Sequence, residues 1–158
     1  ELAVLELLET VKDPEIPVLS VVDMGVVREV SAENGAVKVV ITPTSSGCPA
    51  MDMIEAHIRK ALRRAGYDPI TIKTVLAPAW TTDWLTESGR EKLRAYGIAP
   101  PVANSTDKRA LMAEFSSVPC PRCGAMDTRM ISQFGSTACK ALYQCRECLE
   151  PFDYFKCH

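Results

Sequence analysis

The stretch CPRCGAMDTRMISQFGSTACKALYQCREC, residues 120–148, begins and ends with a Cys-x-x-Cys pair. Each pair can present two thiolates to one ion from a single tight turn, and two pairs complete a tetrahedral site with metal–sulfur bonds of about 2.3 Å. The 21 residues between the pairs exceed the usual range for a four-cysteine zinc site by one residue. We therefore predict one metal ion per chain, bound by Cys120, Cys123, Cys145 and Cys148.

This cysteine-rich segment, residues 120–158, is too small to fold on its apolar side chains alone. A metal site stabilises such a module, because the binding energy is then also folding energy. Gly124 suits the sharp turn after the first pair, and residues 129–134 and 141–144 can form the strands of a ribbon. All-thiolate sites suit both zinc and iron–sulfur clusters. The pattern favours zinc, so we expect a structural zinc ribbon.

Three further potential ligands lie outside the paired pattern, namely Cys139, Cys157 and His158. They are either small buried side chains or additional ligands of a second or shared metal site. The chain has seven cysteines, an odd number, and shows no signal-peptide pattern. These features favour metal binding in a reducing compartment over a disulfide framework.

The composition of the whole chain is that of a folded protein. Its 158 residues are 47% hydrophobic and 24% charged, which excludes a disordered chain, and no apolar run reaches the roughly 18 residues of a membrane span. The net charge of −2 argues against a general nucleic-acid binder, whose domains are strongly basic. Residues 98–119 are rich in proline, serine and asparagine, and we predict a linker there that includes a short apolar helix.

Residues 1–97 are predicted to form a small α+β domain with the order α-β-β-α-β and a further helix before the linker. Asn34-Gly35 between two β-branched runs is typical of a hairpin turn, and apolar residues at helical spacing follow Pro49. Gly66 and Gly97 are placed to end helices. The predicted helices are 2–11, 49–65 and 85–96, and the predicted strands are 26–30, 37–41 and 70–76.

A single cysteine, Cys48, lies outside the C-terminal segment, in the loop Thr42-Pro-Thr-Ser-Ser-Gly-Cys48-Pro49 between a predicted strand and a predicted helix. Pro49 suits the first helical position, which makes Cys48 the predicted N-cap. The positive end of a helix stabilises a thiolate there, and Gly47 lets a ligand come close to the backbone. Two interpretations stay open, a functional thiol or a half-buried cap without chemistry.

Acids in turn-like segments and hydroxyls of the same loop could support this thiol. The alternative is that these acids are solvated or merely cap turns. His57, Trp80 and Trp84 are more simply explained by packing, although a tryptophan beside a turn can also present a surface to a partner. The candidate supporting residues are Asp13, Glu15, Asp23, Thr42 and Thr44.

Three segments together resemble the signature of the domain found in iron–sulfur assembly accessory proteins. They are Asp13-Pro14-Glu15-Ile16-Pro17, Val22-Asp23-Met24-Gly25-Val26-Val27 and the loop that ends in Cys48-Pro49. The resemblance covers residues 3–77. It implies an α+β fold and a functional thiol at Cys48, which would bind iron or an iron–sulfur cluster transiently.

Four more segments extend a likeness over almost the whole chain: 77–84, 89–101, 134–143 and 150–158. With the two Cys-x-x-Cys pairs, they resemble the PaaD family, whose members belong to the phenylacetyl-CoA epoxidases, also called phenylacetate-CoA oxygenases. The resemblance implies a cytoplasmic accessory protein of aerobic phenylacetate degradation. Its partners would be the other subunits of the complex, the iron–sulfur reductase or the di-iron oxygenase, whose clusters or metals it would help to assemble.

The resemblance implies no epoxidation by this chain itself. In agreement, the sequence has no paired Glu-x-x-His motifs for a di-iron site and no nucleotide-binding glycine fingerprint. The alternatives are a zinc-ribbon protein that binds nucleic acid, a purely structural scaffold, and a thiol oxidoreductase. A homodimer is compatible with all of them.

Overall fold

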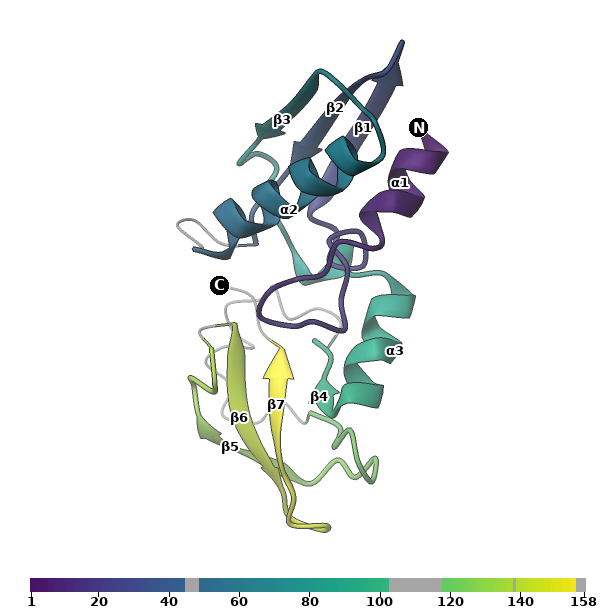
Figure 1. Ribbon diagram of the computed structural model, residues 1–158. Helices are drawn as coiled ribbons and strands as arrows, with labels where there is room; N and C mark the ends of the chain where they lie inside the picture. The colour runs from purple at the N-terminus through teal and green to yellow at the C-terminus, as the bar shows by residue number, and fades with distance from the viewer. Residues whose placement is uncertain (45–48, 103–117, 138, 156–158) are drawn as a thin grey trace. The chain divides into compact units, whose positions relative to one another are not determined.

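The computed structural model describes residues 1–44, 49–102, 118–137 and 139–155. The chain divides into two compact units, unit 1 with residues 1–89 and unit 2 with residues 90–158 (Figure 1). The division falls within helix α3 (Glu87–Tyr96), ahead of residue 97, where the sequence pattern places the end of the first domain. No helix in the described part of the chain combines the length and the apolar character needed to cross a bilayer.

Unit 1 contains a three-stranded sheet with the order β1-β2-β3 (Figure 1). Strands β1 (Val27–Glu33) and β2 (Ala36–Ile41) form an antiparallel hairpin, and β3 (Ile70–Thr74) runs parallel to β2. A parallel neighbour needs a crossover connection, and helix α2 (Ala50–Arg64) provides it. Asn34 and Gly35 have φ angles of 50° and 83°, so the predicted hairpin turn is confirmed.

The core of unit 1 lies between the sheet and two helices, α1 (Leu2–Leu8) and α2. Val37, Val39 and Ile41 on one face of β2 are buried, as are residues of α2 at helical spacing, which is the burial expected from the two periodicities. Val40, on the other face of β2, is buried as well. The helix predicted over residues 2–11 ends earlier, at Leu8, because Thr10 and Val11 donate their N–H groups to carbonyls only three residues back. The core includes Val4, Leu8, Val37, Val39, Ile41, Ile54, Ile58 and Leu62.

Unit 2 contains a four-stranded sheet with the order β4-β7-β6-β5. Strands β5 (Thr128–Ser132), β6 (Lys140–Cys145) and β7 (Pro151–Phe155) are antiparallel neighbours, whereas β4 (Ile98–Ala99) runs parallel to β7. The sequence predicts β5 and β6 but neither of the other two strands. The first residues after α3, which composition assigns to a linker, therefore belong to the ribbon sheet.

Gly25 shows how closely the loops of unit 1 approach one another. A methyl group added there would lie 2.7 Å from the Cβ of Trp84 and closer still to its carbonyl oxygen, and the φ of Gly25 is +69°. We expect Gly25→Ala to lower the free energy of unfolding by about 2–4 kcal/mol, because backbone strain and overpacking add.

The control for this change is Gly66→Ala. Gly66 also has a positive φ, +90°, but no heavy atom lies within 4 Å of an added methyl group. This variant should lose only about 1 kcal/mol, the cost of the left-handed backbone. Urea unfolding of both full-length variants measures the difference, and equal losses would contradict the close packing of Gly25 against Trp84.

Candidate functional site

The two Cys-x-x-Cys pairs occupy turns of the same construction. The N–H of Cys120 donates to the carbonyl of Ala125 over 2.9 Å, and the N–H of Cys145 donates to the carbonyl of Glu150 over 3.1 Å. Each bond closes a loop around the second cysteine of its pair. The bond keeps each turn closed, so that both cysteines of a pair lie close together.

The residue after each pair adopts a left-handed backbone. Gly124 has a φ of 78° and Leu149 a φ of 64°. The prediction that Gly124 forms the sharp turn is confirmed. At Leu149 the same turn is made by a residue that carries a side chain, at a cost of about 1–2 kcal/mol, so the geometry of the second pair is held by its surroundings.

The four sulfur atoms form one cluster, as predicted. The Sγ atoms of Cys120 and Cys148 are 3.7 Å apart, and those of Cys123 and Cys145 are 3.6 Å apart. All four lie within 4.8 Å of one another. A tetrahedral ion with metal–sulfur bonds of about 2.3 Å requires sulfur atoms about 3.8 Å apart, whereas a disulfide requires about 2.05 Å. The cysteines present fit a metal ion.

The pKa values of two of the thiols also indicate a site for a cation. The N–H of Cys148 lowers the pKa of Cys145 to about 7. The N–H of Glu150 acts on Cys148 in the same direction, but burial and the neighbouring thiols together raise the pKa of Cys148 to about 12. Cys148 therefore stays protonated beside Cys145 when no cation is bound, because a second thiolate there would be repelled. A divalent cation removes this repulsion and allows all four cysteines to bind as thiolates. Soft thiolate ligands select zinc or iron.

Two of the ligands belong to the core of unit 2. Cys120 and Cys145 are buried in one cluster with Ala99 of β4, Val118 and Phe152 of β7. A metal ion held by these cysteines ties the two turns to the sheet. The metal site and the packing of unit 2 are consequently one structural element.

Among the remaining predicted ligands, the structure describes only Cys139. Cys139 is half-buried just before β6 and is not a member of the four-sulfur group. Cys157 and His158 lie outside the described residues, as does Cys48. Their predicted roles therefore stay predictions.

The loop of residues 42–49, which contains Cys48, follows the last residue of β2. Thr42 is buried, its N–H donates to the carbonyl of Val26 over 2.9 Å, and its hydroxyl has no hydrogen-bond partner among the described residues. Thr44 is half-buried. Helix α2 begins at Ala50, one residue later than predicted, because Pro49 takes the capping position with an already helical backbone. The prediction that Cys48 is the N-cap of this helix is therefore wrong.

Two of the three candidate acids, Asp13 and Asp23, hold turns together rather than standing in solvent. The carboxylate of Asp13 is buried and accepts the N–H groups of Glu15 and Ile16, each over 2.8 Å. Asp23 is also buried, and it accepts the N–H of Ser20 and the hydroxyl of Thr86 over 3.1 and 3.2 Å. Glu15 itself is half-exposed. The sequence could not show that Thr86 completes this contact.

We expect Asp23→Ala to lower the free energy of unfolding by about 1–3 kcal/mol, because a buried N–H and a hydroxyl lose their acceptor. Asp83→Ala is the matched control, since Asp83 is an exposed aspartate in the same unit. Thermal unfolding of both variants gives the comparison. A normal melting temperature for Asp23→Ala would show that this carboxylate does not stabilise the fold.

The two tryptophans differ in their surroundings. Trp80 is 6% exposed and its indole N–H donates to the carbonyl of Met24 over 2.8 Å, which confirms the packing role. Trp84 is half-buried beneath the guanidinium of Arg28, 3.5 Å from the ring centre. This cation–π contact was not predicted, because Arg28 carries no sequence signal for it. His57 is exposed on α2.

Comparisons with known proteins support two modules. Residues 1–69 match a family model described as an iron–sulfur cluster assembly protein, and residues 104–156 match the PaaD zinc beta ribbon domain. A crystal structure of a DUF59 domain from Bacillus anthracis is similar with a TM-score of 0.55 and 28% identity, over 59% of this chain and 90% of that one. The predicted α+β fold class is thereby confirmed.

Two curated relatives carry functional names. An Fe-S protein maturation auxiliary factor from Porphyromonas gingivalis is 34% identical over 92 residues, which are 57% of this chain and 87% of that protein. A protein of Escherichia coli K12, named as a subunit of a 1,2-phenylacetyl-CoA epoxidase, is 50% identical over 151 residues. That match covers 96% of this chain and 89% of the relative. The shared stretch spans both modules, and this chain belongs to the PaaD family of phenylacetyl-CoA epoxidase subunits.

Proposed function

We propose that this chain is a non-catalytic accessory protein that helps to assemble iron–sulfur clusters or metal centres in other subunits of a phenylacetyl-CoA epoxidase. The observation that carries the proposal is the 50% identity to an epoxidase subunit along 96% of the chain. The match of residues 1–69 to an iron–sulfur assembly domain supports the assembly role. The protein would act in the cytoplasm, where phenylacetate is degraded.

In this proposal Cys48 is the functional thiol. Its thiolate would bind iron or a cluster transiently and release it when cysteines of the recipient subunit replace it as ligands. Ligand exchange of this kind needs a soft donor beside an accessible backbone. The loop that precedes Pro49 offers the cysteine, a glycine and several hydroxyls. Asp13, Asp23 and Thr42 would act indirectly, by holding the segments around this loop.

The four-cysteine site would have a different role. We propose that it holds one zinc ion permanently and stabilises unit 2. Its closed set of four thiolates supports this assignment, because a structural zinc site has no open position. The recipient would be the iron–sulfur reductase or the di-iron oxygenase subunit. Unit 2 would then contribute a rigid surface rather than a metal for transfer.

Metal analysis of protein purified without air tests this division of roles. After incubation with ferrous iron and sulfide, the wild type should retain zinc at the ribbon and bind additional iron. Cys48→Ser should keep the zinc and lose the iron, because a serine hydroxyl stays protonated at neutral pH and is a poor ligand for iron. Equal iron content in both proteins would contradict the role of Cys48.

A further inference from the structure

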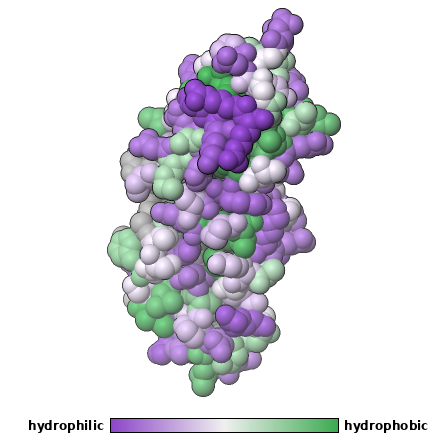
Figure 2. Space-filling view, viewed as in Figure 1, coloured by the Kyte–Doolittle hydropathy of each residue, from purple (hydrophilic) through white to green (hydrophobic). Residues whose placement is uncertain are grey.

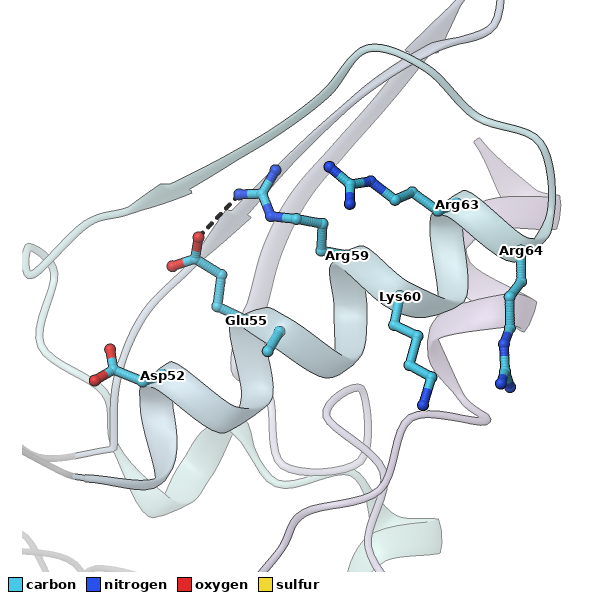
Figure 3. Close-up of a pocket in the computed structure, with 7 residues that line it drawn as sticks. Asp52, Glu55, Arg59, Lys60, Arg63 and Arg64 are labelled. Carbon is cyan, nitrogen blue, oxygen red and sulfur yellow. Dashed lines mark hydrogen bonds and ion pairs between the residues drawn. The ribbon is translucent and has the colours of Figure 1, made fainter.

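The C-terminal half of α2 presents four cations, which we call the basic face of α2. Its members are Arg59, Lys60, Arg63 and Arg64. Arg59 and Arg63 project to one side of the helix, and Lys60 and Arg64 project to the other (Figure 3). Together with Ala56 and two acids they line an open hollow of about 530 Å³. Figure 2 shows a strongly hydrophilic patch over this helix.

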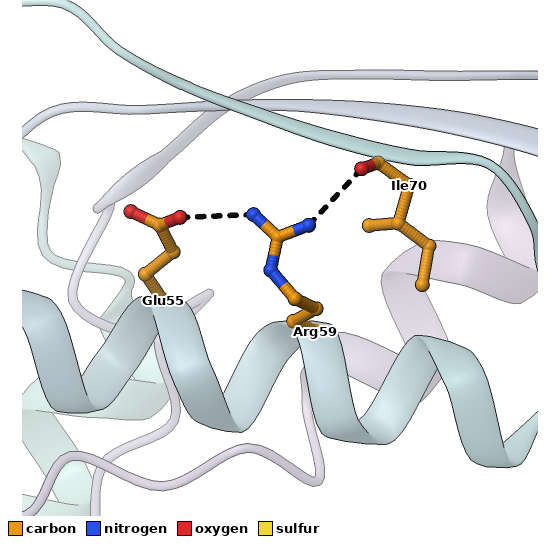
Figure 4. A network of polar contacts seen from close by, with 3 residues as sticks. All are labelled: Glu55, Arg59 and Ile70. Carbon is orange, nitrogen blue, oxygen red and sulfur yellow. Dashed lines mark hydrogen bonds and ion pairs between the residues drawn. The ribbon is translucent and has the colours of Figure 1, made fainter.

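Only one of these cations has a partner in the described part of the chain. The guanidinium of Arg59 donates to Glu55 over 3.0 Å and to the carbonyl of Ile70 over 3.1 Å (Figure 4). Its position is therefore fixed by the fold. The side chains of Lys60, Arg63 and Arg64 make no hydrogen bond or ion pair with any residue that the structure describes.

Unit 1 as a whole is acidic, which makes this concentration of cations unusual. Residues 1–89 contain 8 lysines and arginines and 13 acids, a net charge of −5. Half of the cations lie within residues 59–64. Neighbours three and four positions apart on the helix repel one another there. The helix dipole compensates for this repulsion only in the last turn, at Arg63 and Arg64.

We propose that the basic face of α2 is a docking surface for an acidic segment of a partner protein. Guanidinium groups bind carboxylates through two parallel hydrogen bonds, and three of the four cations here are arginines. Nucleic acid fits less well, because phosphate binding depends on a broad positive field. Asp52 and Glu55 border the hollow, and unit 1 has a negative net charge. Both would repel the negatively charged phosphates of a nucleic acid.

The identity of the partner rests on the proposed function. Helix α2 starts two residues after Cys48, and the basic face lies about 14–21 Å along the helix axis from Ala50. A recipient subunit that docks there would present its own cysteines near the start of the helix. The docking surface would therefore bring the recipient to the functional thiol and set its orientation.

Two triple variants of the full chain test the surface. Both remove three positive charges from unit 1, and all six side chains are exposed. The basic-face variant carries Lys60→Gln, Arg63→Gln and Arg64→Gln. The control variant carries Lys12→Gln, Lys38→Gln and Lys73→Gln.

Three probes are titrated by fluorescence anisotropy: a short labelled peptide of alternating glutamate and alanine, a labelled DNA duplex, and the labelled reductase subunit of the epoxidase. The basic-face variant should bind the peptide and the reductase roughly tenfold more weakly than the wild type, because three exposed charge pairs are lost. The control variant should bind them like the wild type. Added salt should weaken binding of the peptide to the wild type.

Peptide binding that is absent, or equal in both variants, would overturn the docking surface. A different outcome is a wild type that binds DNA more tightly than the peptide, with DNA binding weakened in the basic-face variant but not in the control variant. That result would replace the acidic partner by nucleic acid. If the reductase binds the wild type and both variants alike, the docking surface fails while the proposed function stands. If the peptide shows the expected pattern but the reductase does not bind, the surface stands and this recipient is wrong.

Discussion

Cys145→Ser is expected to remove the ribbon metal and to unfold unit 2 from β4 to β7, while unit 1 keeps its fold. Cys145 is both a ligand and a fully buried member of the core. Metal binding by such small modules is worth about 10–16 kcal/mol of folding free energy, which exceeds the total stability of a small domain. Elemental analysis gives the metal per chain, and amide hydrogen exchange shows which strands lose protection.

Cys139→Ser is the control for this prediction, since it makes the same chemical change at a cysteine outside the four-sulfur cluster. It should keep one metal ion per chain and protected amides in β6 and β7. The double variant Cys123→Ser, Cys145→Ser removes one ligand from each turn. A full metal content in that variant would show that the ion is bound elsewhere.

Cys48→Ser is expected to leave the protein folded and to reduce the cellular activity of the epoxidase to about that of a strain without this chain. Serine is close to cysteine in size, and residue 48 precedes the capping residue Pro49, so the change leaves α2 and its cap intact and the melting temperature should change little. The loss would arise because the hydroxyl cannot replace a thiolate as an iron ligand.

Epoxidase activity in a strain whose only copy carries Cys48→Ser provides the measurement, with Cys139→Ser as the matched control strain. Normal activity with Cys48→Ser would show that this thiol is not needed for the function. The function would then have to reside in Cys139 and Cys157 or in surfaces that contact the partner subunits.

Local sequence signals predicted the elements of unit 1 well. Asn34-Gly35 specifies a tight turn without help from the rest of the chain, and the apolar spacing of residues 49–65 specifies α2. The four ribbon cysteines were equally predictable, because Cys-x-x-Cys brings two ligands together within one turn. In each case the information lies within a few neighbouring residues.

Features that depend on distant residues could not be predicted. Strand β4 has only two residues, and it exists because Ile98 and Ala99 pair with β7, far along the chain. The sequence around Asp23 is typical of a loop with a solvated carboxylate, yet this side chain accepts a hydrogen bond from Thr86, 63 residues away. The basic face of α2 has a visible spacing of three and four residues, but only the structure shows that three of its cations lack partners among the described residues.

The central claim is that this chain delivers iron or clusters to another subunit through Cys48. The most direct measurement is the iron and acid-labile sulfide content of the reductase subunit, purified without air from three strains: wild type, a deletion of this chain, and Cys48→Ser. We predict a filled cluster in the wild type and a largely empty site in the other two. A reductase with a full cluster in the deletion strain would contradict the claim.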